Sequence, residues 1–294
     1  MLPKEIVKKI REIEIKTSQK VTEVFAGRYE SVFKGKGMDF DEVREYQPGD
    51  EIRSIDWNVT ARMGKPYIKR FVEERELSII LMLDASLSCK VGTRKRLKID
   101  LAAEVCSVLA FSAISNNDKV GLVIFTDKIE KFVYPQKGTE HVLRIIRETL
   151  CFKPKGKQTD IANALQFLDK IVNHRAVCFI ISDFFSPNYK KALSIANKKH
   201  DIIAVRMTDP IEERFSNVGI VQLQDAETGE DFLIDTSNKG LVDKYSTQAQ
   251  KKLKQLEKMF TLASIDMISL YTDRPYIDPL VRFFRTREMR LANK

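Results

Sequence analysis

The sequence predicts an α/β protein with a doubly wound, mostly parallel sheet, preceded by an N-terminal helix and a small β-rich module. Two observations carry this prediction. Continuous apolar runs of strand length, at residues 77–84 and 176–182, are typical of strands covered on both faces. Between such runs, residues 77–294 hold segments with helical spacing of apolar side chains, and alternating strands and helices are typical of a parallel sheet.

Each element of the region 77–294 follows from its own pattern. Strands are expected at residues 77–84, 120–125, 129–134, 176–182, 202–207 and 263–270, with 129–134 at an edge. Helices are expected at residues 97–114, 141–150, 161–171, 241–262 and 279–289. The first of these helices is apolar almost all round, which indicates burial inside the domain. Alternation around the turn at residues 227–230 predicts a hairpin insertion near 217–236.

The first 76 residues have a different character. Residues 1–25 place apolar side chains at helical spacing among Lys and Glu, which predicts a helix. Residues 26–76 alternate short segments with Gly-containing turns, which predicts the β-rich module. We expect Trp57 to be at least partly buried there. The polar residues expected to fix the turns of the module are Arg44, Asp50, Arg53 and Asp56.

Composition limits the class of protein. With 294 residues and 43% hydrophobic side chains, the chain can bury a sizeable core. No apolar run reaches the roughly 18 to 20 residues of a membrane-spanning helix, and the first residues lack the apolar core of a signal peptide. The four cysteines form no CxxC pair and are expected to be reduced and mostly buried. We therefore expect a cytoplasmic protein.

The charge points to partners. The net charge is +9, and the excess of Lys and Arg is concentrated in residues 237–294. Nucleic-acid binding through the basic helix at 241–262 is one reading. No interleaving of aromatic and basic residues and no zinc-finger pattern accompanies that helix, so a solvated basic face, or a face for an acidic protein, is favoured.

Five oxygen-bearing side chains have the spacing of a divalent-metal site. Asp84, Ser86 and Ser88 follow the first buried strand, Thr159 precedes a helix, and Asp183 follows another buried strand. The carboxyl ends of parallel strands meet at one edge of a sheet, which would bring these side chains together. Carboxylate and hydroxyl oxygens select a hard ion, Mg²⁺ or Mn²⁺. The alternative is that the first three residues only cap a turn or a helix.

This site would have room for a partner. Serine hydroxyls neutralise little of the charge of the ion, so a carboxylate of another protein could complete the coordination. Arg94, Lys95 and Arg96 follow the first metal loop, and cations there oppose the dipole of the next helix. We expect these cations, together with Asp160, to meet an acidic partner. The alternatives are a solvated loop for the cations and, for Asp160, the N-cap of the helix at 161–171.

The pattern resembles known families. Residues 77–207 resemble a von Willebrand factor A domain, and the five oxygen-bearing residues match its metal-ion-dependent adhesion site one by one. Over roughly residues 23–290 the chain resembles the bacterial domain-of-unknown-function fifty-eight family. This wider resemblance rests on GRYESVFKGKGMDF (27–40), REYQPGD (44–50), RSIDWN (53–58), and residues 70–71 and 73–76. Leu87 departs from the family, which often has Gly there, and this bears on metal affinity.

The resemblance implies a function. Members of the family accompany MoxR-type AAA+ ATPases, so it implies such an ATPase as partner and a role in maturing or assembling protein complexes. We expect a non-enzymatic interaction protein that uses Mg²⁺ or Mn²⁺. The alternative from another class is a metal-dependent hydrolase, in which the ion activates water. Against it, no histidine base or second carboxylate cluster accompanies the site in sequence.

Overall fold

A six-stranded sheet forms the centre of the protein. The computed structural model describes residues 32–33, 39–72, 77–90, 92, 96–224 and 231–292. The sheet has the order β10-β7-β6-β3-β4-β5, and every neighbouring pair is parallel except β4 and the edge strand β5. The strands are β3 (Ser78–Asp84), β4 (Lys119–Phe125), β5 (Ile129–Gln136), β6 (Val177–Ser182), β7 (Asp201–Thr208) and β10 (Asp266–Tyr271). The predicted fold class is confirmed.

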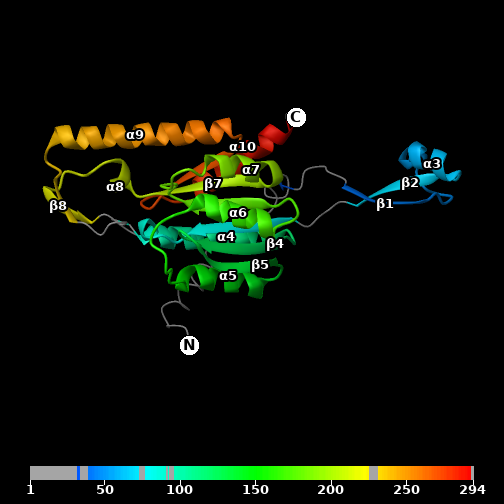
Figure 1. The fold of residues 1–294 in the computed structure, drawn as a ribbon, viewed down its shortest axis with the longest axis horizontal. Helices are drawn as coiled ribbons and strands as arrows, with labels where there is room; N and C mark the ends of the chain where they lie inside the picture. Colours follow the sequence, from blue (N-terminus) through cyan, green and yellow to red (C-terminus); the bar gives the residue numbers. More distant parts are fainter. Residues whose placement is uncertain are drawn as a thin grey trace.

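Helices cover both faces of this sheet (Figure 1). One face carries α4 (Lys98–Ser115), α5 (Thr139–Cys151) and α10 (Ile277–Ala292), and the other carries α6 (Ile161–Ile171), α7 (Lys190–Lys199) and α9 (Lys239–Leu262).

Alternate residues of β3 pack against the helices on opposite faces of the sheet, because successive side chains of a strand point to opposite faces. Leu81 packs in the core on the α4 side, and Met82 packs in the core on the α6 side. A strand buried on both faces reads as a continuous apolar run, which is why the sequence revealed it.

The predicted elements of residues 77–294 are present, with ends within three residues of the prediction. The helix α4 is buried on nearly every side, as its apolar composition indicated. Among the described α-helices of this region, two were not predicted, α7 and the short α8 (Pro210–Glu213). The first is short and Lys-rich and the second is a single turn, so neither has a strong apolar period. The predicted hairpin consists of β8 (Ile220–Gln224) and β9 (Asp231–Asp235), which pair antiparallel.

The module before the α/β domain is only partly β-structure. β1 (Asp39–Glu45) and β2 (Tyr67–Val72) pair antiparallel, but the 3-10 helix η1 (Ile52–Ser54) and the helix α3 (Trp57–Met63) lie between them. The predicted N-terminal helix at residues 1–25 lies outside the described residues.

Only some of the polar residues that we expected to fix the turns of the module make such contacts. Arg44 forms an ion pair with Asp50 at 2.7 Å, and the carboxylate of Asp56 caps α3 by accepting from two backbone amides. Arg53 is exposed. The expectation for Trp57 is wrong: its side chain is 68% exposed at the first position of α3, a short helix that has no buried residues.

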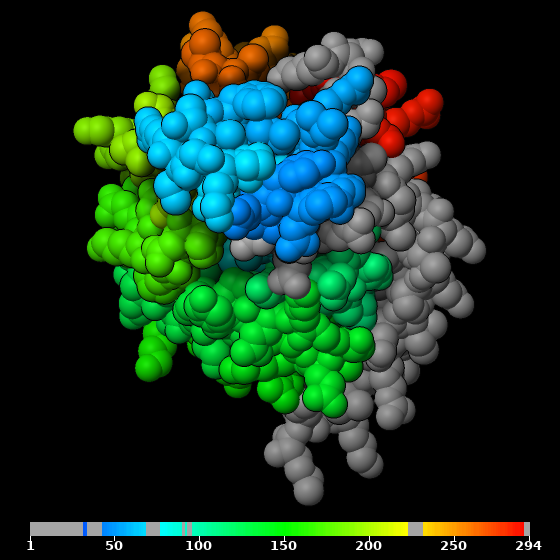
Figure 2. Space-filling view, turned by 90° about the vertical axis from the view of Figure 1, so that its right-hand side faces the viewer, coloured from blue at the N-terminus to red at the C-terminus, as the bar shows by residue number. Residues whose placement is uncertain are grey.

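The module and the carboxyl edge of the sheet lie at opposite ends of β3. The module connects to the amino end of β3 and stands to one side of the sheet in Figure 1; Figure 2 looks onto this face of the molecule. A seven-residue strand spans roughly 23 Å. A site at the carboxyl end of β3 is therefore separated by the length of this strand from the end to which the module connects. Among the described helices, none is long and apolar enough to cross a membrane.

Candidate metal centre

Asp84 is the central residue of the site. It is the last residue of β3 and has no exposed surface. Its Oδ2 accepts a hydrogen bond from the hydroxyl of Ser182 at 2.6 Å, and its Oδ1 accepts from the backbone amide of Ser86 at 3.0 Å. The hydroxyl of Thr159 lies 3.3 Å from Oδ2. The loop after β3, the segment before α6 and the end of β6 therefore converge on one carboxylate.

The first metal loop is held from two sides. The hydroxyls of Ser86 and Ser88 lie 2.9 Å apart, on the start of the 3-10 helix η2 (Leu87–Lys90). The backbone amide of Leu87 donates to the carbonyl of Lys157 at 3.1 Å, which ties this loop to the loop that carries Thr159. Both serine side chains thus stay near Asp84.

Glu130 fixes the loop that carries Thr159 by accepting hydrogen bonds from its backbone. Its Oε1 accepts hydrogen bonds from the amides of Gly156 at 2.6 Å and Lys155 at 3.0 Å, and from the hydroxyl of Thr126 at 3.0 Å. Burial opposes ionisation of this carboxyl, but the three donors outweigh it and lower its pKa. A Cβ at Gly156 would lie 2.1 Å from the side-chain oxygen of Thr126, so only glycine fits this close approach. The backbone at Lys155 and Gly156, shortly before Thr159, is therefore held in place.

Asp183 enters the site through a strained backbone. It follows the end of β6, and the next residue, Phe184, has φ +62°, a left-handed conformation that bulky side chains rarely adopt. Phe184 is buried and its ring packs edge-on against Phe260 with centroids 5.1 Å apart. This packing supports the strained turn, and such turns occur at functional sites. The amide of Phe185 donates to Oδ1 of Asp183 at 3.1 Å.

A buried lysine also reaches Asp183. The side chain of Lys98, from the first turn of α4, has no exposed surface, and its Nζ lies 3.1 Å from Oδ2 of Asp183. The same ammonium group also donates to the carboxylate of Glu212 in α8. Burial opposes the charged form of Lys98, but the two carboxylates outweigh it and raise its pKa. The lysine is therefore a fixed positive charge.

The electrostatics of the centre leave negative charge for a cation. Burial, and then the charge of Asp183, raise the pKa of the Asp84 carboxyl to about 6. Burial also raises the pKa of Glu212. With Asp84, Asp183 and Glu212 ionised, the single charge of Lys98 leaves two negative charges, which a divalent ion would balance.

The donor set fits Mg²⁺ or Mn²⁺. All five predicted ligands offer oxygen, and the hydroxyls leave positions for water or for an external carboxylate. Cys89 is buried beside the site, and burial raises its pKa far above the usual range, so it stays a neutral thiol. Within the described part of the chain, no group of three or more His, Cys, Asp or Glu gathers as a metal cluster. The centre depends on hydroxyls as much as on carboxylates.

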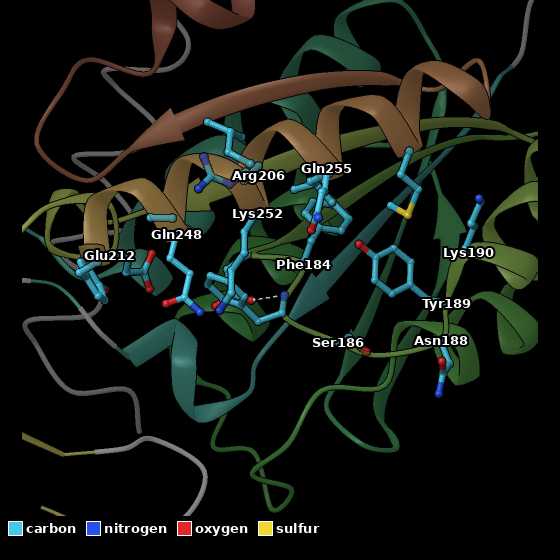
Figure 3. A pocket seen from close by; sticks show the side chains of 17 residues that line it. Phe184, Ser186, Asn188, Tyr189, Lys190, Arg206, Glu212, Gln248, Lys252 and Gln255 are labelled. Atoms are coloured by element: carbon cyan, nitrogen blue, oxygen red, sulfur yellow. Dashed lines mark hydrogen bonds between the residues drawn. The ribbon is translucent and has the colours of Figure 1, made fainter. Parts of the chain in front are cut away.

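A pocket of about 660 Å³ opens beside Asp183. Figure 3 shows side chains of α9 on one side of it and those of the loop after β6 on the other. The loop contributes Phe184 and Tyr189, and Arg206 and Glu212 lie at the same pocket.

Comparison with known proteins shows the family. The family described as "Protein of unknown function DUF58" matches residues 42–255, most of the chain. This chain belongs to the DUF58 family. An uncharacterized protein of Mycobacterium tuberculosis is 31% identical to it over 283 residues, covering 95% of this chain and 88% of that relative. The uncharacterized protein YeaD of Bacillus subtilis is 31% identical over 109 residues, 36% of this chain and 24% of that protein.

Solved structures resemble this DUF58 protein more distantly. BatB from Bacteroides thetaiotaomicron has 14% identity and a TM-score of 0.43, over 74% of this chain and 100% of that chain. The von Willebrand factor A domain of SpRpn10 has 13% identity and a TM-score of 0.39, over 71% of this chain and 94% of that one.

The residues predicted to meet a partner behave differently in this DUF58 protein. Arg94 and Lys95 lie outside the described residues. The guanidinium of Arg96 pairs with Glu104 at 2.9 Å and donates to backbone carbonyls near Thr272, so it joins α4 to the segment after β10. Asp160 accepts from the amide of Asn163 at 2.9 Å, which is the N-cap role that the sequence left open. Both side chains are thus used within the domain.

Sequence reasoning missed three residues of the candidate site in this DUF58 protein: Lys98, Ser182 and Glu212. Lys98 lies two residues after the cations Arg94, Lys95 and Arg96, and only the contact with Asp183, 85 residues away, distinguishes it from them. Ser182 precedes Asp183, and a polar residue at the end of an apolar strand was a usable signal. Glu212 belongs to a capping box with Asp209 at the start of α8, a pattern that indicates a helix start but not a contact with a lysine.

Proposed function

We propose that this DUF58 protein is a non-enzymatic protein-interaction module that binds an acidic residue of a partner through Mg²⁺ or Mn²⁺. One observation carries the proposal: Asp84, Ser86, Ser88, Thr159 and Asp183 gather at the carboxyl edge of the sheet. Such an oxygen-only set binds a hard ion, and its hydroxyls leave that ion attractive to an added carboxylate.

Accessibility supports binding of a partner. Asp84 is buried, but Ser88 and Thr159 are partly exposed and Asp183 borders the pocket. The basic helix α9 forms the far wall of that pocket and presents Lys252 there. Positive charge around the approach favours an acidic surface and raises its rate of association.

The partner that we propose is a MoxR-type AAA+ ATPase, and the process is maturation or assembly of protein complexes. This part rests on the resemblance of the sequence to the family that accompanies such ATPases. The chain has no phosphate-binding GxxxxGK[ST] loop of its own, so an ATPase would contribute what this sequence lacks.

Affinity capture of partners from a lysate tests the proposal. We expect wild type to retain an AAA+ ATPase in Mg²⁺ and to release it in EDTA, and Asp183→Ala to fail to retain it. The matched control is Asp243→Ala, an exposed carboxylate on α9, which should behave as wild type. Retention that is equal in EDTA and in Asp183→Ala would overturn the role of the metal. Phosphatase or nuclease activity that needs Mg²⁺ or Mn²⁺ and is lost in Asp183→Ala would instead favour a hydrolase.

A further inference from the structure

Helix α9 is anchored at both ends and spans a hollow between them. Near its start, the ring of Tyr245 packs against Phe215 with centroids 4.3 Å apart, and Val242 is buried. Near its end, Phe260 is buried in the core and packs against Phe184. The middle of the helix has neither kind of anchor and instead lines the 660 Å³ pocket.

Helix α9 is amphipathic, and its apolar face lies over the hollow. Apolar side chains recur at helical spacing along it, at Tyr245, Ala249, Leu253, Leu256 and Met259. All five are only partly buried. Tyr245 packs against Phe215, and Leu256 and Met259 pack against the core. Between these contacts, Ala249 and Leu253 line the pocket and are available to a ligand.

The pocket and the metal centre share a residue. Asp183 is both a candidate metal ligand and part of the pocket lining, because the loop after β6 forms the wall opposite α9 (Figure 3). The buried rings of Phe184 and Tyr189 belong to this wall. A ligand carboxylate at the metal position would therefore place its neighbouring groups at the mouth of the pocket.

The chemistry of the lining favours a peptide. Exposed Gln248 and Gln255 offer amide groups that can pair with a peptide backbone, whose N–H and C=O groups need partners when buried. Lys190 and Lys252 add positive charge, and the ammonium of Lys252 lies 5.8 Å from the ring centroid of Phe185. The volume is within the range of about 300–1,000 Å³ of ligand pockets, enough for a few residues.

We propose that this pocket is the second half of the binding site and recognises a short extended peptide segment. The acidic residue of the segment binds at the metal, and an adjacent aromatic or large aliphatic side chain fills the pocket under α9. This inference rests on the proposed metal-dependent function and adds a specificity element to it: the partner sequence pairs an acidic residue with a large apolar neighbour.

Short blocked peptides test the pocket directly. The probes are Gly-Gly-Phe-Asp-Gly-Gly and Gly-Gly-Asp-Phe-Gly-Gly, acetylated and amidated, with matched peptides in which Ala replaces Phe or Asn replaces Asp. In Mg²⁺, we expect at least one Phe–Asp order to bind about tenfold or more tightly than its Ala version, because an aromatic side chain leaves water. The Asn version, and EDTA, should abolish binding.

Variants of α9 locate the effect. Ala249→Trp fills the pocket and should remove the preference for Phe over Ala, and the milder Ala249→Leu should reduce it. Gln250→Trp, on the adjacent exposed position that does not line the pocket, is the matched control and should keep the preference. Thermal unfolding with and without Mg²⁺ checks that each variant folds and keeps its response to the ion.

The outcomes separate the two proposals. If Mg²⁺ raises the melting temperature but Phe and Ala peptides bind equally, or neither binds, the pocket inference is overturned while the metal site stands. If the preference survives in Ala249→Trp, the pocket is not the apolar site. If Mg²⁺ has no effect on melting and no peptide needs it, the proposed function itself fails.

Discussion

The ammonium nitrogen of Lys98 lies 3.1 Å from Oδ2 of Asp183, with the lysine side chain wholly buried. The contact joins the start of α4 to the end of β6, and the second contact of Lys98, with Glu212, adds α8. A permanent cation thus sits beside the candidate metal position. It holds Asp183 in place without a metal, and it repels an ion that would bind there.

Replacing Lys98 should destabilise the metal-free protein and strengthen its response to Mg²⁺. Lys98→Met should lower the free energy of unfolding in EDTA by about 3 kcal/mol, because two partly or wholly buried carboxylates lose their counter-charge. Mg²⁺ should then raise the melting temperature of the variant more than that of wild type. Lys254→Met, an exposed position on α9, should change neither quantity. Equal responses of Lys98→Met and wild type to Mg²⁺ would contradict the arrangement.

Asp84 should make stability depend on pH in a defined direction. Its pKa is about 6 in the folded protein against an ordinary value of 3.8, so the folded state holds the proton more tightly. The stabilising contribution is present below about pH 4 and is lost as the pH rises through about 6. A difference of about two units corresponds to about 3 kcal/mol.

Asp84→Asn isolates this effect because asparagine does not titrate. In EDTA, the stability of the variant relative to wild type should shift in its favour by up to about 3 kcal/mol between pH 4 and pH 7. Urea unfolding at both values measures the shift, and Gln250→Ala serves as the non-titrating control. Parallel profiles of stability against pH for the variant and wild type would show that folding does not raise the pKa of Asp84.

Glu130 should affect the metal without touching it. Glu130→Ala removes the acceptor for the amides of Lys155 and Gly156, which should cost about 1 kcal/mol of stability. The loop that carries Thr159 should loosen, so calorimetry should find weaker Mg²⁺ binding. Glu140→Ala, at an exposed position in α5, should leave both measurements as in wild type. Unchanged ion affinity in Glu130→Ala would mean that Thr159 contributes little to the site.

Trp57 gives a direct check of the module. It is the single tryptophan of the chain and is 68% exposed. The fluorescence of the native protein should therefore be solvent-like, readily quenched by acrylamide, and little shifted on unfolding. Trp57→Ala should change stability by less than about 0.5 kcal/mol, as for surface positions in general. Blue-shifted native emission would show that another surface covers the ring.

The sequence determined the elements of the sheet. A strand buried on both faces must be apolar throughout, so β3 and β6 were visible as uninterrupted runs, and α4 was visible because it is apolar all round. Four of the candidate ligands were visible for a related reason: Asp84, Ser86, Ser88 and Asp183 stand where these runs end, and parallel strands bring their carboxyl ends to one edge. Thr159 was visible by its place before a helix. Local patterns carry such information because neighbouring residues share one environment.

Only the tertiary structure decided which charges meet. Lys98 and Arg96 are only two residues apart, yet Lys98 is buried against Asp183 and Arg96 binds the segment after β10. Their partners lie 85 and 176 residues away, and no local pattern encodes such pairs. The exposure of Trp57 and the hollow under α9 are likewise products of packing. Which face of a helix is covered depends on the elements opposite it, which are set by the arrangement of the whole chain.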